Sequence, residues 1–137
     1  MSNVGTVHTI YAAFGRGDVE AILGYLSEAV EWEYGVNTTD VPWLQPRVGR
    51  SGAAEFFQSL RALDFSSFRV SLVVGDGDTV IALCDVEAVV RETGRTFVEH
   101  DEVHIWSFDA AGLVTRFRHR VDTLQQWRAY HGQATEA

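Results

Sequence analysis

The sequence predicts an α+β protein, with helices in its first half and antiparallel strands in its second half. Apolar residues recur at helical spacing over residues 4–14. Two long β-rich runs, residues 79–90 and 96–108, come much later in the chain. A capping-box-like pattern that begins at Asp122 predicts a short final helix.

The elements of the first half follow from local signals. The first helix is predicted to end at residues 15–17, where two glycines flank an arginine. Asp18 is a suitable N-cap for a second helix. Residues 29–34 alternate between polar and apolar side chains, which is typical of a strand. Residues 35–50 hold both prolines and predict a long loop, after which Ser51 is expected to cap a third helix.

The second half is predicted to consist of strands joined by tight turns. Four strands are expected, over residues 68–74, 79–90, 96–108 and 113–121. Gly75-Asp-Gly-Asp78 is a hairpin signal, and residues 109–112 form the next turn. Without repeats or linkers, residues 1–137 are expected to form a single domain, with a flexible tail at 132–137.

The charge and the N-terminus indicate a soluble protein that binds neither nucleic acid nor membrane. The formal net charge of −8 is unfavourable for binding nucleic acid or anionic lipid. No apolar run approaches the ~20 residues that span a bilayer. Residues 1–9 have neither the basic nor the apolar region of a signal peptide, so we expect a cytoplasmic location.

Residue types that are absent exclude several kinds of chemistry. Cys84 is the single cysteine, which excludes an intrachain disulfide and a cysteine-based zinc site. All basic side chains are arginine, so Schiff-base chemistry and a P-loop lysine are also excluded.

The last two predicted strands have one charged face. Side chains alternate across a strand, so Arg116, Arg118 and Arg120 lie on one side. Glu99 and Asp101 share this side, which makes a cross-strand charge ladder. Because burying such charges costs free energy, this face is expected to point outward.

The opposite face is expected to point toward the helices. It combines apolar residues with side chains that can transfer protons: His100, Glu102, His104, Trp106, Phe108, Leu113, Phe117, His119 and Val121. A four-residue turn would place Glu102 opposite His119, and a slip of two residues would change partners but not faces. The preceding strand adds Ala82, Cys84 and Val86, whose small side chains leave room for a cavity.

Several segments together resemble a known family. They are Tyr11-Ala-Ala-Phe14, Gly17-Asp18, Val30-Glu-Trp32, Gly49-Arg-Ser-Gly-Ala, His104-Ile-Trp106, Gly112 and Thr115 through Thr123. The pattern resembles SnoaL-like proteins of the nuclear-transport-factor-like, ketosteroid-isomerase-like superfamily, and it covers essentially the whole chain. The resemblance implies a cone: a curved antiparallel sheet wrapped on three helices around one pocket, with a short C-terminal helix. Isomerases, polyketide cyclases, epoxide hydrolases, dehydratases and non-enzymatic domains share this fold, so it does not fix a reaction.

The resemblance carries over few of the residues used by ketosteroid isomerases. Their general-base aspartate aligns with Trp32. Their oxyanion-binding tyrosine aligns with Ile10, one position before Tyr11. The standard form of that chemistry is therefore not predicted.

The comparison with limonene epoxide hydrolases leaves one acid–base group. Their last-strand aspartate aligns with His119, whereas their Asp–Arg pair aligns near Cys84 and Val86. We therefore expect His119 to act as acid or base, with Glu102 beside it raising its pKa from the ordinary value of about 6.5. His104 is expected to donate a hydrogen bond to a ligand carbonyl. The alternative for these residues is a polar group that only orders the core.

The predicted pocket takes a small apolar molecule and needs neither cofactor nor metal. Residues expected to contact the ligand are Trp32, Tyr34, Trp43, Cys84, Val86, His100, Trp106 and Phe117. Trp43 lies in a proline-containing loop, where it is either a lid or a surface residue. His100 and His104 are roughly 13 Å apart along a strand and cannot share a metal. Glu102, His104 and His119 form a geometrically possible ligand set, but we expect no metal there.

Three functions agree with these observations. The first is cofactor-free acid–base catalysis of isomerase, cyclase or hydrolase/lyase type, without the standard catalytic aspartates. The second is a binding domain without chemistry. The third is a dimeric accessory domain with a filled interior. For all three, the resemblance implies a homodimer formed through the outer face of the sheet.

Overall fold

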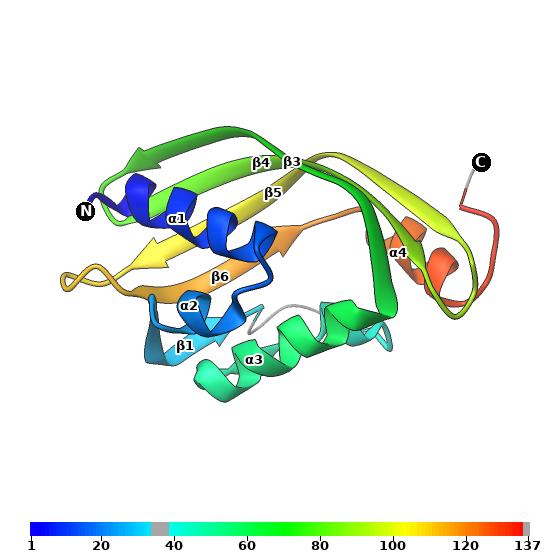
Figure 1. The fold of residues 1–137 in the computed structure, drawn as a ribbon, viewed down its shortest axis with the longest axis horizontal. Coiled ribbons are helices and arrows are strands. Elements are labelled where there is room, and N and C mark those ends of the chain that lie inside the picture. Colours follow the sequence, from blue (N-terminus) through cyan, green and yellow to red (C-terminus); the bar gives the residue numbers. More distant parts are fainter. Residues whose placement is uncertain (34–38, 136–137) are drawn as a thin grey trace.

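In the computed structural model, which describes residues 1–33 and 39–135, helices cover one face of a curved six-stranded sheet (Figure 1). The helices are α1 (Asn3–Gly15), α2 (Val19–Leu23), α3 (Gly49–Ser59) and α4 (Thr123–Tyr130), with 3₁₀ turns η1 (Pro42–Leu44) and η2 (Leu60–Ala62). The strands are β1 (Leu26–Trp32), β2 (Arg47–Val48), β3 (Leu63–Asp76), β4 (Thr79–Val90), β5 (Thr96–Phe108) and β6 (Val114–Arg120). The predicted α+β class is confirmed.

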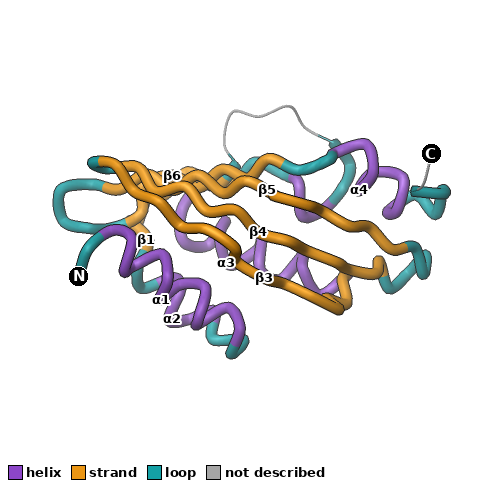
Figure 2. Tube along the Cα trace, turned by 90° about the horizontal axis from the view of Figure 1, so that it is seen from above, coloured by secondary structure: helices purple, strands orange, loops and turns teal. Residues whose placement is uncertain are grey.

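The sheet has the strand order β2-β1-β6-β5-β4-β3. All neighbouring pairs are antiparallel except β1 and β6, which run parallel. The expectation of a purely antiparallel sheet is thus wrong at one pair, because β1 comes from the helical half of the chain and joins the sheet beside its last strand. Figure 2 shows α4 at the far end of the sheet from the N-terminus.

The helix ends confirm two predicted caps and correct a third. Asp18 accepts a hydrogen bond from the backbone N–H of Ala21, and Asp122 caps α4 in the same way. Ser51 is not a cap, because α3 begins earlier, at Gly49. Gly49 has a φ of +80°, which lets the chain turn from β2 directly into the helix.

The two long strands at residues 79–90 and 96–108 have the predicted bounds, whereas the other three differ, β6 by one residue at each end. Strand β3 begins at Leu63 rather than at residue 68, because its polar first residues pair with β4 despite their weak strand pattern. Strand β1 covers 26–32 instead of 29–34. The predicted strand residue Tyr34 lies outside the described residues. Thr135 belongs to the tail that was predicted to be flexible, and its hydroxyl donates a hydrogen bond to the carbonyl of Thr96.

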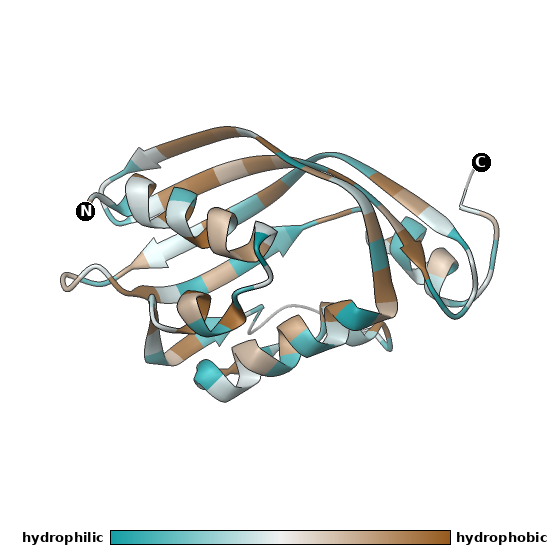
Figure 3. Cartoon of the chain, viewed as in Figure 1, coloured by the Kyte–Doolittle hydropathy of each residue, from teal (hydrophilic) through white to brown (hydrophobic). Residues whose placement is uncertain are grey.

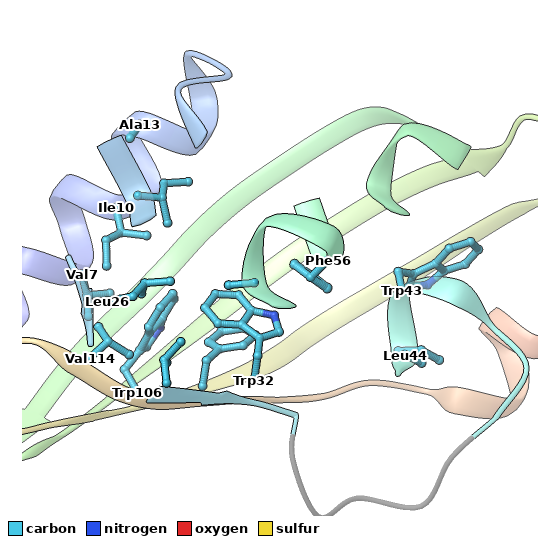
Figure 4. Close-up of a cluster of buried hydrophobic side chains, with 14 of the residues drawn as sticks. Val7, Ile10, Ala13, Leu26, Trp32, Trp43, Leu44, Phe56, Trp106 and Val114 are labelled. Atoms are coloured by element: carbon cyan, nitrogen blue, oxygen red, sulfur yellow. The ribbon is translucent and has the colours of Figure 1, made fainter. Parts of the chain in front are cut away.

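The core lies between the helices and the sheet. Val7 and Ile10 of α1 face Trp106 and Trp32 (Figure 4), and each of these side chains is at most 2% exposed. Trp32 also stacks on Phe117, with ring centroids 4.3 Å apart. These large rings form the walls around the candidate site.

The outer face of the sheet carries apolar side chains that reach solvent. Leu72 and Val74 of β3 are 46% and 48% exposed, and Ile81 of β4 is 37% exposed. Figure 3 shows the hydrophobic colouring along β3 and β4. None of the helices in the described part of the chain has the length and apolar character needed to span a bilayer.

Candidate functional site

A cavity of about 80 Å³ lies between the helices and the inner face of the sheet. Its walls are mainly aromatic and aliphatic, and come from α1, α2, α3 and the strands. Its polar groups include the side chains of Tyr11, Glu102, His104 and His119. The predicted inner face therefore does border a cavity.

A chain of short hydrogen bonds joins Tyr11 of α1 to two residues of β5. The Tyr11 hydroxyl lies 2.6 Å from Nδ1 of His104. On the other side of the ring, Nε2 of His104 lies 2.6 Å from Oε2 of Glu102. Trp106 adds a donor, since its Nε1–H points to the Tyr11 oxygen at 3.2 Å. Glu102, His104 and Trp106 alternate along β5, which places all three on the cavity face.

The protonation states of this chain follow from burial and charge. Burial alone would lower the pKa of His104, but hydrogen bonds to Cys84 and Glu102 and the charge of Glu102 raise this pKa to about 9. His104 is therefore an imidazolium at neutral pH, and both of its nitrogens donate hydrogen bonds. Burial raises the pKa of Tyr11 far above its ordinary value of 10, so the phenol keeps its proton.

This arrangement leaves the Tyr11 proton available to a ligand. The phenol oxygen accepts one hydrogen bond from His104 and one from Trp106. Among the described residues, the other close neighbour is Sγ of Cys84, 4.0 Å away at the outer limit of a hydrogen bond to sulfur. Two donors on the oxygen make the hydroxyl a stronger donor, because donation and acceptance polarise each other.

His119 of β6 has the opposite electrostatic character. Burial lowers its pKa to about 4, and the positive charges of His104 and Arg120 act in the same direction, against Glu102. Its ring is therefore neutral at pH 7. Nε2 is buried and makes no hydrogen bond within the described residues. The His119 and His104 ring centroids are 6.1 Å apart, so a neutral imidazole and an imidazolium face the same cavity.

The predicted pairing of Glu102 with His119 is wrong. In the sheet His119 lies opposite His104, and Glu102 binds His104 on its own strand. The pKa of His119 is accordingly lowered and not raised. Because side chains alternate, the slip of two residues kept the paired residues from Val103 to Trp106 on their predicted faces.

Two small irregularities produce this slip. The turn is one residue longer than predicted, so Phe108 pairs with Val114. Ser107 then pairs with Arg116, which leaves Thr115 as a bulge. Each irregularity moves the register by one residue.

A second bulge, in β5, corrects the prediction for His100 and Glu99. His100 and Asp101 together face Asp85 of β4. Asp101 has a φ of 60°, and its backbone N–H donates to the Asp85 carboxylate at 3.1 Å. The bulge reverses the faces of the residues before it. His100, predicted to contact the ligand, is therefore exposed, whereas Glu99, predicted to face outward, is only 5% exposed.

Most of the other predicted contact residues border the cavity. Trp32, Trp43, Val86, Trp106 and Phe117 do so. Cys84 does not line it and lies behind the polar chain, 3.6 Å from Nδ1 of His104. Tyr34 falls outside the described residues. Among the described residues, no group of three His, Cys, Asp or Glu side chains has the arrangement of a metal site.

The surface-residue alternative for Trp43 is wrong, because its ring is buried and borders the end of the cavity near α4. It is 3% exposed, and its Nε1–H donates to Oε1 of Gln126 at 2.7 Å. Gln126 in turn donates to Glu99 at 3.0 Å, and Glu99 accepts two contacts from the backbone N–H of Asp122. This network ties α4 to the sheet.

The sequence interpretation missed Tyr11 as a functional residue. It was assigned only to the apolar face of the first helix, and the family alignment directed attention to Ile10. The available signal was the hydroxyl itself: a tyrosine on an inward helix face needs a hydrogen-bond partner. The predicted inner strand face supplied several candidates for that role.

The chain belongs to the SnoaL-like family. The sequence profile of the SnoaL-like domain matches residues 7–117. The residues that this match spans include Tyr11, Glu102, His104, Trp106 and Phe117.

Solved structures support the cone-shaped, nuclear-transport-factor-like fold. An NTF2-like protein from Burkholderia thailandensis has a TM-score of 0.81 and 26% identity, covering 94% of this chain and 97% of that one. A second NTF2-like protein, from Burkholderia xenovorans, has a TM-score of 0.78 and 27% identity, covering 93% and 95%. TerC, co-crystallised with polyporic acid, has a TM-score of 0.70 and 24% identity, covering 94% and 98%. No curated protein matches the sequence significantly.

Proposed function

We propose that this protein is a cofactor-free enzyme that performs acid–base catalysis on a small apolar compound with a carbonyl oxygen. The observation that carries the proposal is the Tyr11 hydroxyl, held by His104 and Trp106 at the polar part of an otherwise apolar cavity. Preorganised donors of this kind stabilise negative charge that develops on an oxygen in the transition state.

Tyr11 is the proposed donor to the carbonyl oxygen. Because its pKa is raised, it stays protonated and polarises the carbonyl without transferring its proton permanently. His104 is a positioning residue, since it fixes the phenol through Nδ1. Glu102 fixes His104 in turn and holds it as an imidazolium.

His119 is the proposed base. It is neutral at pH 7, borders the cavity and has a buried Nε2. In the proposed step, His119 takes a proton from the carbon next to the carbonyl, and the C–H electron pair forms the enolate, whose oxygen binds Tyr11. Where the ligand has a second double bond beside the acidic carbon, return of the proton from His119 to the far carbon of the dienolate shifts that double bond. Where the ligand has a second carbonyl, the enolate carbon attacks it, the C=O π pair moves to its oxygen, and this alkoxide takes the proton back from His119 as the ring closes. Both outcomes balance without a cofactor.

The apolar walls favour a planar ring compound as the ligand. Trp32, Trp106 and Phe117 present large aromatic surfaces beside the polar chain. TerC, which shares this fold, was co-crystallised with polyporic acid, and this is in agreement with a ring compound as the ligand.

Proton exchange with a simple ketone tests the proposal. 1-Indanone in D₂O, followed by proton NMR, is expected to lose its α-protons faster with the protein than in buffer. Tyr11→Phe and His119→Gln should each slow the catalysed exchange by about 10²-fold or more. Tyr25→Phe and His8→Gln are matched controls, because neither residue borders the cavity, and should exchange at the wild-type rate. Equal exchange by Tyr11→Phe and wild type would contradict the assigned donor.

A binding domain without chemistry is the second candidate. The observation that favours it is that the Tyr11 oxygen and both ring nitrogens of His104 already have partners within the protein, as they would in a structural network. This candidate predicts that 1-indanone raises the melting temperature by mass action while its α-protons exchange at the buffer rate.

We also propose that two copies associate through the outer face of the sheet. Exposed Leu72, Val74 and Ile81 provide an apolar centre. Around it lie the basic side chains of β6 and the acidic side chains of β4 and β5: Arg116, Arg118, Arg120, Asp85, Glu87 and Asp101. A two-fold axis would bring opposite charges together. Sedimentation equilibrium of the wild type should give a dimer, and Ile81→Glu should give a monomer.

A further inference from the structure

The exposure of the cavity walls locates the entrance. Deep in the cavity, the side chains of Trp32, Trp106 and Phe117 are at most 3% exposed. Phe65 also borders the cavity and is 37% exposed. The cavity therefore approaches solvent beside the first residues of β3.

Four phenylalanine rings meet at this place: Phe14 of α1, Phe57 of α3, and Phe65 and Phe68 of β3. The Phe14 centroid is 5.1 Å from Phe68, 6.0 Å from Phe65 and 6.2 Å from Phe57. Phe65 and Phe68 are 6.1 Å apart. Phenyl rings make no hydrogen bonds that must break, so they can rotate aside at low cost.

A bulge places both rings of β3 on the cavity side. Phe65 pairs with Ala88 and Phe68 with Val86, which leaves Ser66 as the additional residue. Without this bulge, residues three apart would face opposite sides of the sheet. Strand β3 is also an edge strand, hydrogen-bonded to β4 alone in the sheet. Phe65 and Phe68 therefore stand on a strand that has a neighbour on one side only.

The inner ring of this group, Phe68, lies beside the proposed donor Tyr11 and its positioning residue His104. The Phe68 centroid lies 6.2 Å from that of Tyr11 and 6.4 Å from that of His104. The end of the cavity near α4 is closed differently, by the hydrogen bond between Trp43 and Gln126. Entry there would require breaking a buried polar network.

The cavity volume shows that the rings must move for a ligand to enter. Pockets that bury a ligand of several rings measure roughly 300–1,000 Å³. The present cavity measures about 80 Å³. A planar compound therefore needs side chains to rotate outward, and the phenylalanine rings beside the solvent are the ones free to do so.

We propose that Phe14, Phe57, Phe65 and Phe68 form an aromatic gate through which planar apolar ligands enter, and whose width selects among them. The inference rests on the proposed use of the cavity as a ligand site, but not on the proposed reaction.

Stopped-flow fluorescence with 2-naphthol as the probe tests the gate. Phe65→Ala removes a partly exposed ring that contacts two others, so the fold should tolerate it. The association and dissociation rate constants should both rise about tenfold or more, with little change in Kd, because the barrier falls while the bound state is kept. Phe68→Leu, a milder change, should act in the same direction. The wider probe 1-pyrenol should bind Phe65→Ala more than tenfold faster than wild type. Val98→Ala is the matched control, since Val98 is 38% exposed, close to the 37% of Phe65, but lies on β5 and does not border the cavity.

The outcomes separate the gate from the ligand site. The gate is supported if Phe65→Ala binds 2-naphthol faster than the wild type does, or binds it when the wild type does not. Wild-type binding with unchanged rates in both phenylalanine variants overturns the gate and leaves the ligand site intact. Faster rates in Trp43→Phe alone place the entrance at the other end and also overturn it. Absence of binding by wild type and both variants overturns the ligand site and the gate together.

Discussion

Replacing Glu102 by glutamine should lower the pKa of His104 sharply. The amide keeps an oxygen that can accept the Nε2–H hydrogen bond, so the shape of the contact is conserved. Only the negative charge 2.6 Å from the ring is removed. The opposing effect of burial then remains, and it favours the neutral ring. The His104 pKa should fall from about 9 to near or below the ordinary 6.5, with the contact to Cys84 limiting the fall.

The magnitude follows from the two pKa values. One pH unit corresponds to about 1.4 kcal/mol, so a His104 pKa of about 9 against 6.5 in the unfolded chain stabilises the fold by about 3 kcal/mol at pH 7 and below. Glu102→Gln should lose a large part of this at pH 7. At pH 10, where His104 is neutral in both proteins, the two should differ much less in their free energy of unfolding.

Histidine ring NMR measures the prediction directly. Long-range ¹H–¹⁵N spectra between pH 5 and 10 give the titration midpoint of each histidine, with the His104 signals assigned from His104→Gln. Glu99→Gln is the matched control, a buried glutamate that hydrogen-bonds to Gln126 instead of a histidine. A His104 midpoint that stays near 9 in Glu102→Gln would refute the assignment of Glu102 as the stabilising charge. If the His104 midpoint is lowered in Glu99→Gln as well, the shift reflects a general loss of structure and not the loss of the Glu102 charge.

Three further predictions concern stability. The folded pKa of His104 lies above its unfolded value, so the stabilisation from His104 is present below pH 6.5 and is lost as the pH rises through about 9. The folded pKa of His119 lies below its unfolded value, so the stabilisation from the neutral His119 ring is lost as the pH falls from 6.5 through about 4. Urea unfolding should therefore show the alkaline loss flattened in His104→Gln and the acid loss flattened in His119→Gln, and unchanged profiles would contradict these pKa directions. Trp32→Ala should lower the free energy of unfolding by about 3–5 kcal/mol, because the ring is 1% exposed and stacks on Phe117; a loss below ~1 kcal/mol in urea unfolding would show that the site collapses around the change. Asp122→Ala should cost about 1 kcal/mol through the lost cap of α4, with Asp109→Ala, a turn residue outside the helices, as a comparison in the same assay.

The parts of the fold that could be predicted are those set by local pattern. The strands at 79–90 and 96–108 are rich in β-formers and are bounded by glycine-containing turns, so their predicted bounds matched the structure. The inward face of β5 was predicted correctly from Glu102 to Phe108, because alternation fixes a face wherever the strand has no bulge. Before the bulge at His100 and Asp101 the same rule gave the wrong face. The bulge is held by a hydrogen bond from the Asp101 N–H to the Asp85 carboxylate, a contact with another strand that a local pattern does not reveal.

The chemistry of the site depends on contacts that sequence alone does not fix. A register slip of two residues left His104 and His119 on the cavity face, but the carboxylate of Glu102 pairs with His104 and not with His119. Glu102 lies two residues from His104 on the same strand and reaches it directly, so His104 becomes the cation. His119 keeps no carboxylate of that kind, and burial makes it the neutral ring that can accept a proton. The phenol of Tyr11 then gains its function from the cation, because an imidazolium donates to the phenol oxygen through Nδ1 and leaves the hydroxyl proton for the ligand. If His104 were instead neutral, with its proton on Nε2, Nδ1 would accept the phenol proton and Tyr11 would have none to offer. The proposed activity should therefore fall as the pH rises through about 9, while the protein remains folded. If the catalysed exchange of the α-protons of 1-indanone stays constant across that range, the function of Tyr11 does not depend on the charge of His104.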